Sequence, residues 1–378
     1  MNPSRRFWIF AATLASVLFL FLLAPKPRFA DLHPFSRPLT EHQDLPSETG
    51  DGHGGEDGDE DGDRDSGVLP SSTNSTLGFG GIFVLSNDTT SWRIQGLRKA
   101  AALTGVELTV PDLNPPQDER VHAAVVGGDP AYPNGPDVIR ASYNHVALLK
   151  EFLRSGQETA LILEDDVDFD VNIGAQVSSL AVTLQVDATG TGQGCTASSD
   201  PYCHEAWDIL WLGHCGMQFT TRTTVLDYED PFALDWDHLT CPFNNYYEQQ
   251  KEGHGSQQIV RGVAPLCTYA YAVTRKAALD IVEHFPERPK GFDMERHVSC
   301  MGGRHNCIAP VPELFHHQTV LGERKIGEKG DDVIQDLDWY KGKHKFTYNV
   351  QWSARCNALG VGEHLVGGWQ CLPGKYDT

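Results

Sequence analysis

Four acidic side chains follow a short apolar run almost directly. The run is 161–163 (Leu-Ile-Leu), and the acids are Glu164, Asp165, Asp166 and Asp168. Carboxylates this close together repel one another, and a bound divalent cation removes that cost. Ligands that are all oxygen atoms suit Mg²⁺ or Mn²⁺ rather than zinc, and such a cation can bridge a diphosphate and neutralise a leaving group. The pattern therefore favours a metal-assisted site, and an acidic turn that caps the next helix is the alternative.

Short apolar runs alternate with segments of helical periodicity after residue 80. We expect strands at 80–85, 106–110, 159–163, 208–212 and 266–273, and helices at 91–103, 138–153 and 275–284. Alternating strands and helices predict an α/β fold with a largely parallel sheet. Ligands of such sheets bind at the carboxyl ends of the strands. The acidic cluster follows one of these predicted ends.

The charge balance excludes one class of partner. The chain has 378 residues, with 30 basic and 51 acidic side chains and a net charge of −21. Nucleic acid is therefore excluded as a partner, because binding it needs basic side chains that replace its counterions. The charge is uneven, since residues 41–65 contain eleven acids and one base.

The N-terminus has the pattern of a membrane anchor. Residues 7–24 carry no charge and follow Arg5 and Arg6. Eighteen helical residues at about 1.5 Å each reach about 27 Å, enough for a thin bilayer. We predict an uncleaved signal anchor with residues 1–6 in the cytosol and the bulk of the chain in the lumen, a single-pass type II membrane protein. A cleaved signal peptide is the alternative, although Pro25 after the cut would be a poor junction.

Residues 25–79 are predicted to be a flexible acidic stalk. They are rich in Gly, Asp, Glu, Ser and Pro, and they have too few apolar side chains for a core. The acidic run at 57–63 is a poor calcium loop, because the twelfth position from Asp57 is Val68 rather than a glutamate. Residues 80–378 then form the folded domain.

The cysteines indicate an oxidising compartment. All nine lie after residue 194 and none is spaced as in a zinc ribbon. In a lumen they form disulfides, and the odd count leaves one free. Two short loops, closed by Cys195–Cys203 and by Cys300–Cys307, are possible pairings. Two glycosylation sequons begin at Asn74 and Asn87.

Several segments, taken in sequence order, resemble glycosyltransferase family 25. They are 82–86 (Ile-Phe-Val-Leu-Ser), Asn144-His145, 160–166 (Ala-Leu-Ile-Leu-Glu-Asp-Asp), 208–216 (Asp-Ile-Leu-Trp-Leu-Gly-His-Cys-Gly), 265–273, Phe292-Asp293, 312–318 (Pro-Glu-Leu-Phe-His-His-Gln) and 349–357. That family includes collagen galactosyltransferases of the secretory lumen and bacterial lipooligosaccharide galactosyltransferases. The resemblance covers about 80–357. It implies a Rossmann-like GT-A fold, a nucleotide-sugar donor that is usually UDP-galactose, and inversion at the anomeric carbon.

The resemblance also implies roles for the acidic cluster. Glu164-Asp165-Asp166 stands where the family has its DxD-like motif. Glu164 and Asp166 would then hold Mn²⁺ (or Mg²⁺) against the donor's diphosphate, with Asp165 at the nucleotide. Apart from the resemblance, His316 of the His316-His317 pair is a candidate for a further metal ligand from the far side of the site, and an ordinary surface or structural role for the pair is the alternative.

The donor's other contacts would come from the first strand and the helix after it. Leu85 and Ser86 stand where the family's first strand meets the nucleotide, and Arg93 and Arg98 are the nearest cations for phosphate. The family usually has a proline and paired arginines after this strand. The segment 87–93 keeps one arginine, a departure that bears on donor affinity.

An inverting transfer needs a base that accepts the proton of the attacking hydroxyl. Asp293 matches the family's aspartate and is our first choice, with Glu295 the second; capping of the following helix is the alternative for Asp293. We expect His145 to pack beneath the acidic loop. Cys215 is expected in a disulfide rather than as a nucleophile. Three tryptophans could instead form a platform for a sugar, although aromatic core is the simpler expectation: Trp211, Trp339 and Trp352.

These expectations combine into one function. The predicted protein is a metal-dependent glycosyltransferase of the Golgi or ER membrane with a luminal catalytic domain. It transfers a hexose from a UDP-sugar to a hydroxyl of a glycan or glycoprotein. The family resemblance implies that this hexose is galactose. Two alternatives stay open: a catalytically inactive luminal relative that binds glycans, and a metal-dependent hydrolase that uses the acids with His316 and His317.

Overall fold

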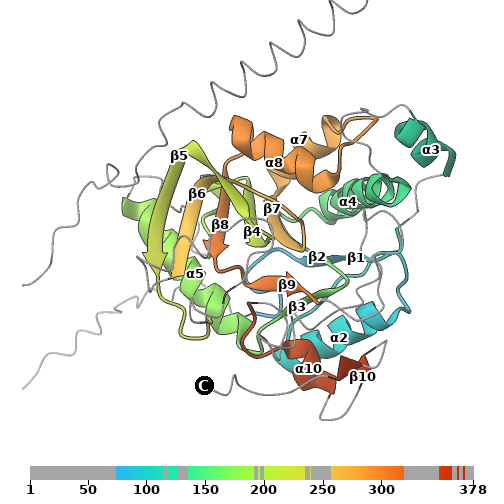
Figure 1. Ribbon diagram of the computed structural model, residues 1–378. Coiled ribbons are helices and arrows are strands. Elements are labelled where there is room, and N and C mark those ends of the chain that lie inside the picture. Colours follow the sequence, from blue (N-terminus) through green and yellow to red (C-terminus); the bar gives the residue numbers. More distant parts are fainter. Residues whose placement is uncertain are drawn as a thin grey trace, which may run out of the picture. The chain divides into compact units, whose positions relative to one another are not determined.

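A mixed sheet of seven strands lies at the centre of the computed structural model (Figure 1). The structure describes residues 74–113, 118–126, 135–190, 195, 200–234, 239, 257–318, 349–359, 364–365 and 369–370. Across the sheet the order is β1 (Ile82–Leu85), β2 (Thr159–Glu164), β7 (Ala270–Thr274), β4 (Ile209–Gly213), β8 (Cys307–Val311), β6 (Gln257–Pro265) and β5 (Met217–Tyr228). The α/β class is therefore confirmed.

The expectation of a largely parallel sheet is wrong. Only β1–β2 and β4–β8 pair in parallel, and the other four neighbouring pairs are antiparallel. The cause is one long two-stranded ribbon: β4 and β5 form one arm, and β6 and β7 form the other. At its bend, Cys215 N donates to Leu266 O (3.1 Å) and Leu266 N donates to Gly216 O (2.9 Å). Hairpin arms are necessarily antiparallel, whereas a parallel pair needs a crossover connection.

Most predicted elements are present, and two differ. Helices α2 (Trp92–Thr104), α4 (Pro136–Ser155) and α7 (Arg275–Glu283) confirm three predictions. The predicted strand at 106–110 makes one parallel bridge, from Thr109 to Phe83. The strand predicted from 266 begins at Ala270, because Cys267 has a left-handed φ of 63° that interrupts the extended backbone.

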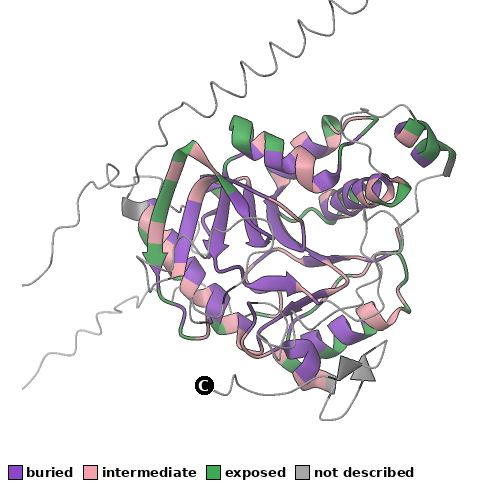
Figure 2. Cartoon of the chain, in the orientation of Figure 1, coloured by how far each residue is buried: buried purple, intermediate pink, exposed green. Residues whose placement is uncertain are grey.

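Two helical layers cover the sheet (Figures 1 and 2). Side chains of successive strand residues point to opposite faces. On one face they pack against α4, α7 and α8 (Phe292–Gly302), and on the other against α2, α5 (Ile173–Gly190) and α10 (Ala354–Leu359). Six of the strands are mostly buried between these layers, whereas the edge strand β5 is largely exposed or half-buried along its length (Figure 2). The result is a three-layer sandwich compatible with a Rossmann-like fold.

Smaller elements complete the fold. Helix α3 (Asp118–Val126) packs on α4, and β3 (Val167–Phe169) pairs with β9 (Phe315–His317). The remaining elements are the 3₁₀ helix η2 (His204–Ala206) and the strands β10 (His364–Leu365) and β11 (Trp369–Gln370).

The predicted stalk ends earlier than residue 79. Leu77 and Phe79 are buried in the core, where Phe79 stacks on Tyr202 at 4.4 Å and Tyr202 Oη donates to Leu77 O (2.6 Å). The folded domain therefore includes residues 74–79. The predicted anchor at 7–24 lies outside the described residues, and none of the described helices combines the length and the apolar character needed to cross a membrane.

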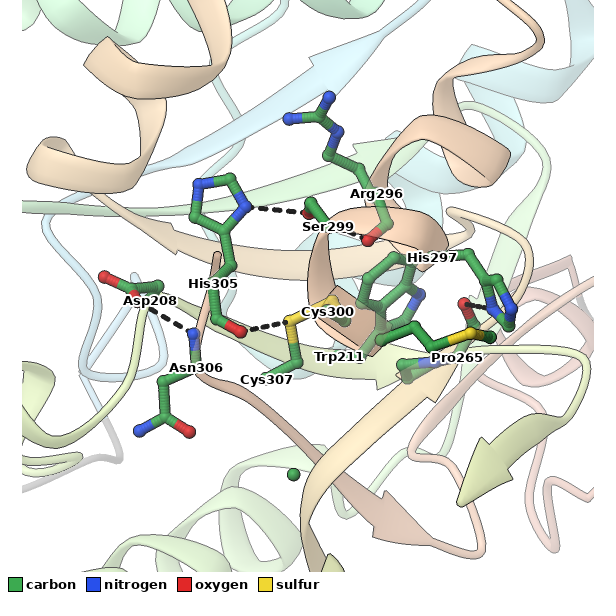
Figure 3. Close-up of a disulfide and its surroundings, with 12 residues drawn as sticks. Asp208, Trp211, Pro265, Arg296, His297, Ser299, Cys300, His305, Asn306 and Cys307 are labelled. Atoms are coloured by element: carbon green, nitrogen blue, oxygen red, sulfur yellow. Dashed lines mark hydrogen bonds between the residues drawn. A yellow bond between two sulfur atoms is a disulfide. The ribbon is translucent and has the colours of Figure 1, made fainter. Parts of the chain in front are cut away.

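Disulfides join several loops. Both short pairings, Cys195–Cys203 and Cys300–Cys307, are confirmed. Figure 3 shows the second, which ties α8 to the start of β8. A third disulfide joins Cys215 to Cys267 across the bend of the ribbon, and Cys356 is also disulfide-bonded. Every described cysteine is thus oxidised, and the predicted free cysteine is not among them.

Candidate active site

Several of the predicted site residues gather at one edge of the sheet. Strands β1, β2 and β4 run in the same direction, so their carboxyl ends share this edge with the start of the antiparallel β7. In register, Leu85 lies beside Glu164. The edge therefore brings together Ser86, the acidic loop Glu164-Asp165-Asp166 at the end of β2, and the residues just before β7.

Two carboxylates of the acidic loop share one guanidinium. Arg93 Nη1 lies 3.5 Å from Asp165 Oδ1 and 3.3 Å from Asp166 Oδ2. Ser86 Oγ donates to Asp165 Oδ2 (2.6 Å). Burial raises the pKa of Asp165, although the hydrogen bond from Ser86 and the charge of Arg93 oppose this rise. The structure thus places Ser86, Arg93 and Asp165 together, as predicted.

Asp166 has an incompletely satisfied carboxylate. Its Oδ1 atom is buried and has no hydrogen-bond partner among the described residues. Burial, followed by repulsion from Glu164 and Asp165, raises the pKa of Asp166 to about 7 despite the opposing charge of Arg93. A cation would supply the missing partner of Oδ1 and relieve the repulsion. The residues therefore fit a divalent cation.

Two side chains, those of Thr268 and His145, hold Glu164 in place. Its Oε1 accepts from Thr268 Oγ1 (2.8 Å) and lies 3.5 Å from His145 Nε2. Burial alone would raise the pKa of Glu164, but the hydrogen bond and charge of His145, followed by the bond from Thr268, hold it below its usual value. His145 is itself buried and stacks on Phe292 at 4.3 Å. The prediction that His145 packs beneath the acidic loop is confirmed.

The two candidate bases have different surroundings. Asp293 lies in the first turn of α8, where its Oδ1 accepts from Met294 N (2.8 Å), whereas the N-cap is Gly291. Burial, and then the charge of Glu164, raise the pKa of Asp293. Glu295 instead accepts from Lys290 N (3.1 Å) at the start of the helix. Asp293 as the base, with Glu295 as the second choice, therefore stays a prediction.

His316 lies behind the acidic loop. In the β3–β9 pair it stands opposite Asp168, and its Nε2 is 3.6 Å from Glu313 Oε1. Its side chain is 1 % exposed, and burial holds its pKa well below the usual value. Within the part of the chain that the structure describes, no three side chains of His, Cys, Asp or Glu form a metal site. Metal ligation by His316 therefore stays a prediction. Mg²⁺ in proteins often has only one or two carboxylate ligands, because phosphate oxygens of the substrate and water supply the others.

Arg98 does not join the acidic loop. This exposed side chain donates from Nη1 to Thr89 O (3.3 Å), and among the described residues it forms no ion pair. Trp211 is fully buried and donates to Cys267 O (2.7 Å), which confirms the aromatic-core expectation for this residue. Trp339 lies outside the described residues, and Cys215 is disulfide-bonded as expected.

Sequence reasoning missed Arg355, which supports the acidic loop from the core side. The side chain is fully buried. It donates to three backbone carbonyls, those of Val167 (2.6 Å), Arg93 (2.9 Å) and Asp165 (2.5 Å). One arginine therefore ties the loop to the first turn of α2. No spacing in the sequence signals this contact, since Arg355 lies 190 residues after Asp165.

Comparison with protein-family models found no match, and comparison with curated proteins found none either. The resemblance to glycosyltransferase family 25 therefore stays a prediction.

Proposed function

We propose that this chain is a metal-dependent inverting glycosyltransferase with a GT-A domain. Its donor is a UDP-sugar, a UDP-hexose such as UDP-galactose, and its acceptor is a hydroxyl of a glycan or glycoprotein. The observation that carries the proposal is the buried Oδ1 of Asp166, which has no partner among the residues that the structure describes and lies in an acidic loop at the carboxyl edge of the sheet. Ligands of α/β sheets bind at this edge.

The acidic loop holds the donor's diphosphate end. Asp166 and Glu164 would hold Mn²⁺ or Mg²⁺, which supplies charge neutralisation for the departing UDP. Arg93, which already faces Asp165 and Asp166, is the nearest protein cation for the phosphates. Ser86 fixes Asp165 at the end of β1, so the first strand and the acidic loop present one rigid surface.

Asp293 acts on the acceptor. Its carboxylate takes the proton of the acceptor hydroxyl as the oxygen attacks the anomeric carbon, and the bond from that carbon to the UDP oxygen breaks. Attack from the face opposite UDP inverts the configuration. The raised pKa of Asp293 makes its carboxylate a stronger base, and base assistance accelerates a transfer by about 10²–10⁴-fold.

The disulfides support a luminal site of action. Seven cysteines are oxidised in the described part of the chain, a state that persists in the secretory lumen and is rare in the cytosol. Together with the predicted anchor at 7–24, this supports a type II protein of the Golgi or ER membrane.

A donor screen tests the proposal. UDP release is followed with Mn²⁺ for a panel of UDP-sugars, with Asp166→Asn as the test variant and exposed Asp112→Asn as its matched control. We expect turnover with at least one UDP-hexose, lost in Asp166→Asn and kept in the control. UDP binding without turnover of any donor would favour the inactive relative. Metal-dependent hydrolysis of a substrate other than a nucleotide sugar would favour the alternative function, a metal-dependent hydrolase.

A further inference from the structure

The guanidinium of Arg93 lies beside Asp166, one of the carboxylates that would bind a metal ion. A single atom, Nη1, lies between Asp165 Oδ1 (3.5 Å) and Asp166 Oδ2 (3.3 Å). The Arg93 side chain is 24 % exposed, and those of the two acids are 14 % and 18 % exposed. Solvent, and therefore ions, can reach this ion pair.

The backbone of Arg93 is fixed by two hydrogen-bonded neighbours, while its side chain is only partly buried. Ser91 caps α2, and Ser91 Oγ accepts from Ile94 N (3.4 Å). Arg93 O accepts from the buried Arg355 (2.9 Å). A change of partner at the guanidinium therefore involves the Arg93 side chain and does not need movement of the helix.

A divalent cation at Asp166 and the guanidinium of Arg93 compete for the same charge. Two cations beside one carboxylate repel each other, so binding of one weakens binding of the other. An incoming diphosphate brings negative charge and can accept hydrogen bonds from a guanidinium. The diphosphate therefore gives Arg93 an alternative partner when the metal ion binds to the carboxylate of Asp166.

We infer that Arg93 is the resident counter-ion of the acidic loop, displaced from Asp166 by the metal and then transferred to the donor's diphosphate, so that metal and nucleotide bind cooperatively through this side chain. The inference rests on the proposed function, because it assumes that metal and diphosphate meet at this loop. Cooperativity of this kind is reciprocal: UDP raises the affinity for the metal by the factor by which the metal raises the affinity for UDP.

The test measures metal binding rather than activity. Free Mn²⁺ is titrated against the full-length chain by electron paramagnetic resonance, without nucleotide and then with saturating UDP. Arg93→Met removes the competitor, so we expect it to bind Mn²⁺ about five-fold more tightly than wild type without nucleotide. With UDP present the order reverses, because the variant lacks the diphosphate's partner. The cooperativity between UDP and Mn²⁺ should fall by a similar factor or more.

Arg98→Met is the matched control. It removes the same charge from the same helix at an exposed position whose side chain contacts Thr89 O rather than the acids. Without nucleotide, we expect its Mn²⁺ affinity to stay within two-fold of wild type, an effect of long-range charge alone.

The possible outcomes separate the inference from the proposed function. If wild type and Arg98→Met bind Mn²⁺ and Arg93→Met binds it no more tightly, the inference is overturned and the proposed function stands. An equal gain in both variants also overturns it, since general charge would then be the cause. If no variant binds Mn²⁺ with or without UDP, the metal site of the proposed function fails together with the inference.

Discussion

Arg355→Met should destabilise the fold by more than any exposed arginine substitution does. The side chain is fully buried and donates to the carbonyls of Val167, Arg93 and Asp165. A hydrogen bond with a charged partner contributes about 1.5 kcal/mol or more. Three such bonds give a loss of about 4–5 kcal/mol, the range found when one partner of a buried charged group is removed. This is a large part of the 5–15 kcal/mol that typically separates folded from unfolded states.

The assay is urea unfolding of the oxidised protein, followed by tryptophan fluorescence. The matched control is Arg304→Met, which breaks an exposed two-point ion pair with Asp280 (both contacts 2.8 Å) and should cost less than about 1 kcal/mol. Arg355→Lys should lie between the two, because an ammonium keeps the charge but cannot reach three carbonyls in a planar fork.

A second substitution approaches the same arginine from the helix. A Cβ at Gly96 would lie 2.7 Å from Arg355 Nη1. Alanine normally stabilises a helix interior by about 1 kcal/mol relative to glycine. We expect Gly96→Ala to destabilise instead, because three hydrogen bonds prevent the guanidinium from moving away. The reasoning is refuted if Arg355→Met unfolds within about 1 kcal/mol of wild type, or if Gly96→Ala stabilises the protein.

Four further predictions follow from the site and the chain. Asp166→Asn should lower the transfer rate by about 10²–10³-fold, and near-normal activity that a chelator still abolishes would place the metal elsewhere. Asp293→Asn should lower kcat strongly while UDP-sugar binding in a calorimeter stays nearly unchanged, and Glu295→Gln should be milder; the reverse order would assign the base to Glu295. Burial lowers the pKa of His214 to about 4 from 6.5, so its stabilising contribution is complete above pH 6.5 and falls by about 3 kcal/mol toward pH 4; urea midpoints of His214→Gln should show a shallower pH dependence, and an unchanged one would contradict this. The full-length protein should keep its N-terminus and resist alkaline carbonate extraction through residues 7–24, whereas a mature N-terminus at Pro25 would show cleavage.

Local patterns in the sequence predicted the local structure well. Helix α2 was readable because its apolar positions recur with helical spacing between Ser91, which caps its start, and Gly105, whose φ of 71° ends it. The disulfides Cys195–Cys203 and Cys300–Cys307 were also readable, since they close loops of 8 and 7 residues. In each case the determining contacts lie close together in the chain.

Contacts between distant segments were not predictable in the same way. The ribbon that makes β7 antiparallel is held by pairing between 209–228 and 257–274, and apolar runs alone do not specify the direction of a strand. Arg355 was missed because its partners are backbone carbonyls, which have no sequence signature. The acidic loop itself was predicted because charge at a strand end is visible in one short segment.

The Cys215–Cys267 disulfide links the structure of the candidate site to the redox state of the compartment that contains the protein. It joins the end of β4 to the residue before Thr268, and Thr268 holds Glu164 through its hydroxyl. The two cysteines are 52 residues apart, so the reduced chain loses the restraint on a long loop at the edge where the donor would bind. The disulfide therefore adds a restraint to this edge only where the chain is oxidised. Under the proposed function, the enzyme would bind its donor at a fully restrained edge in the secretory lumen and at a less restrained one in a reducing compartment.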